Sequence, residues 1–228
     1  MGSRDVRTTV NCAETQQPLV LVEAKKPTGL VLIFHGAGAD ARQFQRDAED
    51  WCSELPHVKF LMPTAPVRGR MTAWFGFNSK TGRLINYDGV WHQALTFIAE
   101  AQEVHGIPPS RVVLIGFSAG ALMASWVAMN LPTRCGGLII ISGGIPTPDR
   151  LPTFRLADGV QNTPVLYFWG TEDRQFSFEF VHSCVDRLTK LGMRVTFQEI
   201  SGVGHELVDE EMDAICSFLR EVLSLEVS

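Results

Sequence analysis

The stretch Val112-Val-Leu-Ile-Gly116-Phe117-Ser118-Ala119-Gly120 joins an apolar run, a serine between two glycines and the start of a helix-forming segment. The apolar run is typical of a strand covered on both sheet faces, and the G-x-S-x-G pattern after it predicts a sharp turn into a helix. We expect this turn to strain Ser118 and expose its hydroxyl at the carboxyl edge of a sheet. Gly116 and Gly120 are expected because a Cβ there would clash with the neighbouring strands and helix.

Apolar runs and helical segments alternate on both sides of this stretch. The runs are β-branched and nearly continuous, whereas the longer segments have apolar residues three or four apart. This alternation predicts an α/β fold, with a mostly parallel central sheet and helices on both faces. Strands are expected at residues 30–34, 58–62, 111–115, 137–141, 164–169 and 195–200, and helices at residues 89–104, 119–131, 178–191 and 210–225.

The chain length of 228 residues predicts one domain, spanning residues 1–228. With 45% hydrophobic residues, such a domain can bury its own core without disulfides or metals. Two further strands are expected at residues 8–14 and 19–23, as an antiparallel hairpin at the sheet edge, because no helix separates them. Residues 145–163 are expected to form a surface loop, and residues 68–87 a long loop of the kind that covers binding sites.

Charge and cysteine content narrow the function classes. The net charge of -5 provides no basic surface, so we expect no nucleic-acid partner. The five cysteines are scattered and odd in number, which favours a reducing compartment over a disulfide framework. No apolar run approaches the roughly 18 residues of a membrane span, and the first ten residues lack a secretory signal. A cytoplasmic protein is therefore expected.

A serine hydroxyl needs a base to become a nucleophile, and in this fold the acid and the histidine follow the serine in the chain. His205 lies in a glycine-rich turn after the last predicted strand, whereas His182, the alternative, lies inside a predicted helix. Asp173 follows the strand at residues 164–169, with Glu172 as the competing acid. We therefore predict a catalytic triad of Ser118, His205 and Asp173, in which the acid orients the imidazole.

An oxyanion formed at Ser118 requires preorganised N–H donors. One is expected from Ala119, directly after the nucleophile, at the N-terminus of the following helix. The second is expected from Ala37, in the small-residue loop 35–40 after the first long strand. His35 precedes the nucleophile and is interpreted as a residue that organises this loop.

Taken together, these segments resemble the acyl-protein thioesterase and carboxylesterase family of small α/β-hydrolases, over nearly the whole chain. The Pro-x-Ala-Pro stretch with the following Ala-Trp-Phe segment is the most specific signal, because generic hydrolases lack it. The resemblance is carried by Phe34-His35-Gly36-Ala37-Gly38, Pro63-Thr64-Ala65-Pro66, Met71-Thr72-Ala73-Trp74-Phe75, Gly116-Phe117-Ser118-Ala119-Gly120, residues 170–173 and Gly204-His205.

The chain departs from the family pattern at three positions. Ala119 stands where the family usually has Gln, Ala39 where it has Asp, and Thr171 where it often has Asp. These departures leave the predicted triad intact but affect the expected substrate preference.

The resemblance implies hydrolysis of S-acyl, palmitoyl-like groups from protein cysteines, or of small esters and lysophospholipids, without a cofactor or metal. Trp74, Phe75 and Phe77 are candidates for an acyl-binding pocket, or alternatively are core aromatics beneath a loop. A non-catalytic acyl-binding protein is a third alternative, which the complete triad disfavours. No stable membrane insertion is expected, although an exposed apolar loop would allow transient membrane contact.

Overall fold

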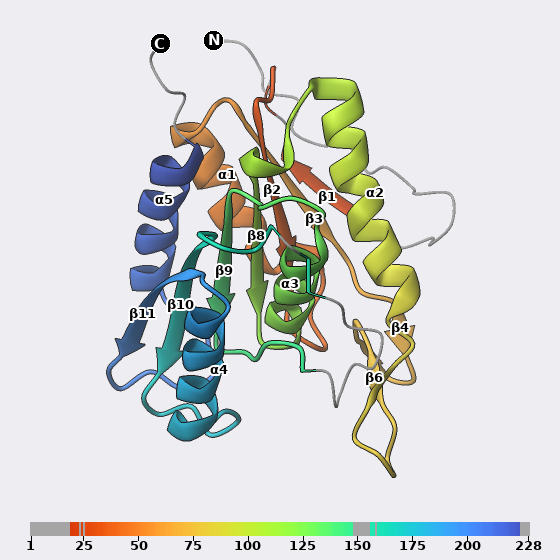
Figure 1. The fold of residues 1–228 in the computed structure, drawn as a ribbon, viewed down its shortest axis with the longest axis vertical. Coiled ribbons are helices and arrows are strands. Elements are labelled where there is room, and N and C mark those ends of the chain that lie inside the picture. The colour runs from red at the N-terminus through yellow and green to blue at the C-terminus, as the bar shows by residue number, and fades with distance from the viewer. Residues whose placement is uncertain (1–18, 23, 25, 148–155, 158, 224–228) are drawn as a thin grey trace.

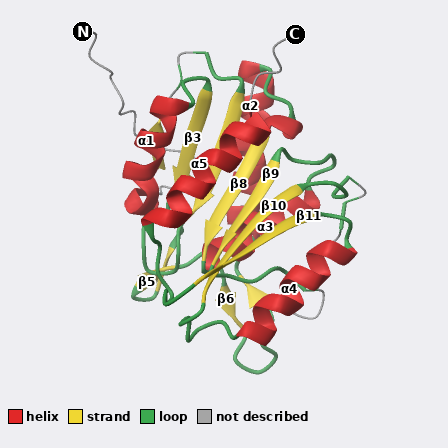
Figure 2. Ribbon diagram, turned by 90° about the vertical axis from the view of Figure 1, so that its left-hand side faces the viewer, coloured by secondary structure: helices red, strands yellow, loops and turns green. Residues whose placement is uncertain are grey.

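The computed structural model describes residues 19–22, 24, 26–147, 156–157 and 159–223, and within them a sheet lies between two layers of helices (Figures 1 and 2). The seven strands of this sheet are ordered β1-β3-β2-β8-β9-β10-β11. Neighbouring strands are parallel except for β1, which pairs antiparallel with β3 at the edge. The strands are β1 (Leu19–Val22), β2 (Gly29–Phe34), β3 (Val58–Pro63), β8 (Val112–Phe117), β9 (Gly137–Ile141), β10 (Pro164–Gly170) and β11 (Arg194–Ile200).

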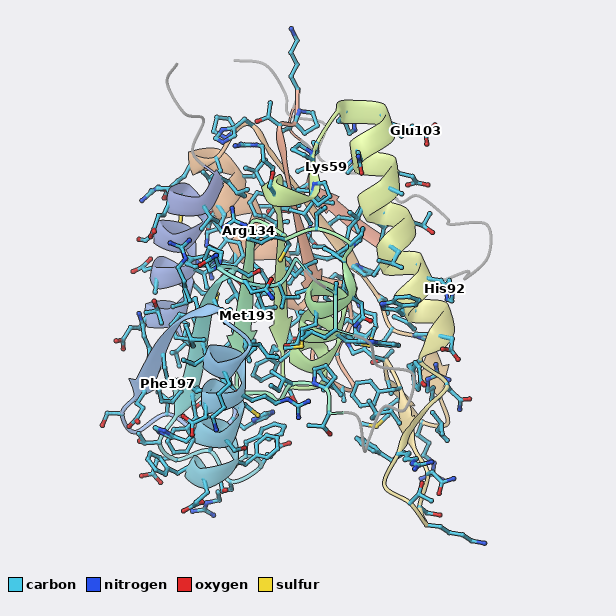
Figure 3. All side chains as sticks on the ribbon, in the orientation of Figure 1. Lys59, His92, Glu103, Arg134, Met193 and Phe197 are labelled. Atoms are coloured by element: carbon cyan, nitrogen blue, oxygen red, sulfur yellow. The ribbon has the colours of Figure 1, made fainter. Side chains whose placement is uncertain are left out.

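The helices bury two separate cores, one on each face of the sheet. Helices α1 and α5 pack on one face, whereas α2, α3 and α4 cover the other (Figure 2). On α2 the exposed His92 and Glu103 lie on the side away from the sheet (Figure 3). The helices are α1 (Gln45–Glu54), α2 (Asp88–His105), α3 (Ala119–Asn130), α4 (Phe178–Lys190) and α5 (Asp209–Leu223), with 3-10 helices η1 (Ala41–Phe44) and η2 (Pro109–Arg111).

The predicted α/β architecture is confirmed, and the six long strands and four helices lie within two residues of their expected positions wherever these are described. Strand β1 is the expected antiparallel edge strand, whereas the strand expected at residues 8–14 lies outside the described residues. Helix α1 was not predicted, because of its ten residues only Ala48 and Trp51 are buried apolar positions.

The segment expected as a long loop at residues 68–87 contains two short β ribbons instead (Figure 1). One ribbon pairs β4 (Val67–Arg68) with β5 (Met71–Thr72), and the other pairs β6 (Gly76–Phe77) with β7 (Leu84–Ile85). Strands of two residues are too short to produce a recognisable alternation in the sequence. In the described part of the chain, no helix is long and apolar enough to cross a membrane.

Candidate active site

Ser118 lies in the turn between β8 and α3, with a backbone φ of 54° and ψ of -118°. A positive φ is costly for a residue with a Cβ, so the strain expected at this serine is present. The flanking glycines permit the turn: a Cβ at Gly116 would lie 2.2 Å from the Gly120 carbonyl oxygen, and one at Gly120 would lie 2.0 Å from that of Phe34. Because both positions are glycine, the backbone segments can approach closely enough to form the turn, which places the Ser118 hydroxyl beside His205.

Three side chains that the sequence analysis selected meet at the carboxyl edge of the sheet. Ser118 follows β8, Asp173 lies three residues after β10, and His205 follows β11. The distance from His205 Nε2 to Ser118 Oγ is 2.9 Å, and that from His205 Nδ1 to Asp173 Oδ2 is 2.8 Å. Because the carboxylate only accepts hydrogen bonds, Nδ1 carries the proton, and Nε2 is left to accept the proton of the serine hydroxyl.

The Asp173 carboxylate is fixed by its own backbone. Its side chain is fully buried, and Oδ1 accepts hydrogen bonds from the backbone N–H groups of Gln175 (2.7 Å) and Phe176 (3.1 Å). The remaining oxygen, Oδ2, is thereby directed to His205. This arrangement orients the imidazole ring.

Neither alternative considered from the sequence occupies this site. His182 lies on α4, where its Nε2 is 3.4 Å from Glu199 Oε1 on the neighbouring strand β11. Glu172 is exposed, and its backbone N–H is hydrogen-bonded to the Val203 carbonyl. In this geometry His205, rather than His182, contacts Ser118, and Asp173, rather than Glu172, contacts His205.

Two aromatic rings that the sequence analysis did not select pack against His205. The Phe117 ring centroid is 5.1 Å from that of the imidazole, and the Phe176 centroid is 5.6 Å from it. Phe117 directly precedes the nucleophile, and its position beside the histidine could have been anticipated from the turn. Phe176 reaches His205 through the tertiary fold, which no local sequence pattern indicates.

The two backbone donors expected at the oxyanion hole are available. Ala119 is the first residue of α3, so its N–H has no partner within the helix. Ala37 is exposed in the loop after β2. Across the residues that the structure describes, no hydrogen bond occupies the Ala37 N–H, whereas the following N–H groups of Gly38 and Ala39 are bonded to Thr72 and Gly36.

His35 is hydrogen-bonded both within the loop of residues 35–40, in which the second donor is expected and which we call the oxyanion loop, and to Ala65. It is buried, and its Nε2 accepts the Ala65 N–H at 2.9 Å, so Nδ1 bears the proton and donates to the Gly36 carbonyl at 2.6 Å. Burial lowers the pKa of His35 and favours this neutral form. In a trans peptide the C=O and the following N–H point in opposite directions, so this bond directs the Ala37 N–H away from His35.

The three aromatic residues expected at an acyl pocket lie in different environments. Trp74 is fully buried, and its Nε1–H donates to the His35 carbonyl at 2.7 Å, so it is a core residue that supports the oxyanion loop. Phe75 is buried as well, and its ring packs edge-on against that of Phe77 at 5.4 Å. Phe77 is 57% exposed on β6, which leaves it accessible to a substrate.

With this geometry established, comparisons with known proteins give the family. The Phospholipase/Carboxylesterase family matches residues 15–223, nearly the whole chain. The chain belongs to this family. It is therefore a serine hydrolase, and the triad geometry accounts for how such chemistry is possible here.

Relatives in this family include both thioesterases and esterases. Acyl-protein thioesterase 1 of Gibberella zeae is 28% identical over 224 residues, covering 90% of this chain and 95% of that protein. A probable carboxylesterase of Oryza sativa subsp. japonica is 28% identical over 210 residues, covering 86% of this chain and 89% of that protein. The crystal structure of esterase PE8 is similar with a TM-score of 0.77 and 26% identity, covering 89% of this chain and 97% of that one.

Proposed function

We propose that this serine hydrolase removes S-acyl groups from protein cysteines, with Ser118, His205 and Asp173 as its catalytic residues. The observation that carries the proposal is the continuous contact from Ser118 Oγ through both imidazole nitrogens to the Asp173 carboxylate, at 2.9 and 2.8 Å. The similarity to acyl-protein thioesterase 1 from Gibberella zeae over 90% of the chain supports an acylated protein as the substrate.

In the proposed mechanism, Ser118 Oγ attacks the thioester carbonyl carbon while His205 Nε2 takes the hydroxyl proton. The backbone N–H groups of Ala37 and Ala119 stabilise the negative charge that develops on the carbonyl oxygen. His205 then donates its proton to the departing thiolate, which leaves an acyl group on Ser118. A water molecule, deprotonated by the same imidazole, releases the acid and restores the serine.

Cleavage of small or lipid esters is the second candidate activity. The same residues carry out both reactions, because thioesters and oxyesters pass through similar tetrahedral intermediates. The similarity to a probable carboxylesterase and to esterase PE8 favours this alternative. The small side chain of Ala119 next to the nucleophile also distinguishes the chain from the pattern of the thioesterases it resembles.

The two ribbons provide a surface through which the enzyme would contact membranes transiently. Residues 66–87 carry four basic and no acidic side chains, in a chain whose net charge is -5. Basic and exposed apolar groups together favour contact with the anionic surface of a membrane. The large apolar side chains exposed on the ribbons are Val67, Met71, Phe77 and Ile85.

We further propose that the protein acts in the cytoplasm. The four cysteines in the described residues are free thiols, which suits a reducing compartment. A cytoplasmic enzyme would meet S-acylated proteins at the inner face of a membrane, where the basic ribbons would contact anionic lipids.

Paired kinetics test the substrate class. Wild type and Ser118→Ala are assayed on an S-palmitoyl peptide and on short- and medium-chain p-nitrophenyl esters, with His182→Ala as a control histidine variant. A higher kcat/KM for the thioester, abolished by Ser118→Ala and unchanged in His182→Ala, supports depalmitoylation. Rapid ester cleavage without thioester cleavage makes the protein a carboxylesterase, and turnover that survives in Ser118→Ala contradicts both.

A further inference from the structure

The oxyanion loop depends on a glycine that has no intrinsic stiffness. Gly36 follows His35, and a Cβ at this position would lie 2.9 Å from the Phe117 ring, which would have to shift to accept it. Glycine has access to the widest range of backbone conformations. The direction of the Ala37 N–H therefore depends on external groups that fix the two peptide planes on either side of Gly36.

His35 and Trp74 fix part of this geometry from the protein interior. The Gly36 carbonyl, in the plane that carries the Ala37 N–H, accepts from His35 Nδ1. The His35 carbonyl, in the preceding plane, accepts from Trp74 Nε1. The remaining group of the preceding plane is the N–H of Gly36, which donates to the side-chain oxygen Oε1 of Gln43 at 2.9 Å.

Gln43 is itself held by the 3-10 helix η1. Asp40 caps this helix, because its Oδ1 accepts the Arg42 N–H at 2.8 Å, and its carbonyl accepts the Gln43 N–H at 3.1 Å. The N–H of Ala41 donates to Thr64 Oγ1 at 2.9 Å, which ties the helix to the segment after β3. The cap at Asp40 and the hydrogen bond to Thr64 therefore fix the backbone of the 3-10 helix from which the Gln43 side chain extends to Gly36.

We propose that Gln43 is a positioning residue of the oxyanion hole. Its side-chain carbonyl holds the Gly36 amide, and through Gly36 it sets the direction of the Ala37 N–H. This inference rests on the proposed function, since it concerns the same oxyanion. Because its side chain is hydrogen-bonded to the Gly36 N–H of the loop, the proposal assigns Gln43 an effect on the transition state.

Replacing Gln43 by leucine removes the acceptor and leaves the Gly36 amide without its partner. Loss of an entire oxyanion donor lowers kcat by about 10²–10³, and a misdirected donor retains part of its effect. We expect Gln43→Leu to lower kcat by roughly tenfold or more with KM nearly unchanged, which indicates an interaction made only in the transition state. An alkyl trifluoromethyl ketone forms a hemiketal with Ser118 whose oxyanion lies in this hole, so it should bind more weakly by a similar factor.

Gln45 provides a matched control two residues further along. It is half-buried, and its side-chain amide donates to Glu49 Oε1 at 2.9 Å on the same helix, in an exposed hydrogen bond. Gln45→Leu therefore makes the same chemical change without touching the loop. Gln43→Glu keeps an acceptor oxygen of the same reach, and it is expected to retain more kcat than Gln43→Leu.

The experiment measures kcat, KM and the trifluoromethyl ketone inhibition constant for wild type and the three variants, with melting temperatures to confirm folding. A fall in kcat and in inhibitor affinity confined to Gln43→Leu, and partly restored in Gln43→Glu, supports the proposal. Equal effects in Gln43→Leu and Gln45→Leu, or a loss expressed in KM, overturn it. If wild type itself cleaves neither thioester nor ester, the proposed function fails instead.

Discussion

Phe176 packs against the ring of His205, and its backbone is hydrogen-bonded to Asp173, the residue that orients this imidazole. Its ring centroid lies 5.6 Å from that of the imidazole, and its backbone N–H donates to Asp173 Oδ1 at 3.1 Å. Its carbonyl also accepts the Trp169 Nε1–H at 2.9 Å. The turn after β10 thus supplies both the acid of the triad and an apolar surface that limits the motion of the histidine.

Phe176→Ala is expected to lower kcat by about tenfold, because a freed imidazole spends less time in hydrogen-bonding distance of Ser118. The backbone bond to Asp173 survives this substitution, so the effect isolates the ring. The measurement is kcat and KM on one ester substrate, together with the pH profile of kcat/KM.

Phe178→Ala is the matched control for this prediction. Phe178 lies two residues further along, is half-exposed, and packs on His182 with centroids 4.0 Å apart. Near-wild-type kinetics are expected for this variant. If both alanine variants lose the same activity, the ring of Phe176 has no special effect on His205.

Trp74→Phe separates two interpretations of that tryptophan. The substitution removes the N–H that donates to the His35 carbonyl but keeps an aromatic ring in the core. We expect a lower kcat with a nearly unchanged KM, because the tryptophan supports the oxyanion loop rather than the substrate. Phe77→Ala, at an exposed position on the ribbon, is expected to raise KM for long acyl chains instead. A higher KM in Trp74→Phe with an unchanged kcat would instead indicate that Trp74 binds the substrate.

Gly120→Ala tests the tight packing of the turn at Ser118. The added Cβ would lie 2.0 Å from the Phe34 carbonyl oxygen, a backbone atom that cannot move aside. The free energy of unfolding should fall by more than about 4 kcal/mol, as for the most severe steric changes. At Gly89, on α2, nothing lies within 4 Å of the added Cβ, so Gly89→Ala is expected to be neutral or stabilising by about 0.5 kcal/mol. Denaturant titration measures both.

Glu211 is expected to make stability depend on pH. It is buried on α5, where its Oε2 accepts the Val208 N–H, and burial raises its pKa from 4.5 to about 7. Between these values the unfolded chain binds fewer protons than the folded one, so stability is lost as the pH rises from about 4.5 to 7. Glu211→Gln should remove this loss, which is on the order of 3 kcal/mol at pH 8.

The comparison uses the slope of unfolding free energy against pH in wild type, Glu211→Gln and Glu221→Gln, a variant at an exposed glutamate of the same helix. Wild type and Glu221→Gln should share a slope that Glu211→Gln lacks. If the unfolding free energies of all three proteins change with pH in parallel, other titratable groups cause the pH dependence.

The sequence predicted the parts of the fold and site that local patterns determine. Buried strands such as residues 137–141 have continuous apolar runs, and the strained turn at Ser118 follows from its two glycines. Helix α1 was missed because its surface is mostly polar.

Gln43 and Phe176 were also missed, and Trp74 was predicted as a pocket or core residue without its hydrogen bond to the His35 carbonyl. Their contacts join segments whose proximity only the tertiary structure determines. The expectation that residues 1–228 form one domain stays a prediction.

Ser118 is proposed as the nucleophile, activated by His205. The most direct measurement is covalent labelling with an alkyl fluorophosphonate, with the site mapped by mass spectrometry of proteolytic peptides. The adduct should lie on Ser118, be absent in Ser118→Ala, and form far more slowly in His205→Ala while His182→Ala reacts at the wild-type rate. An adduct on another residue, or hydrolysis that continues in Ser118→Ala, would contradict the account.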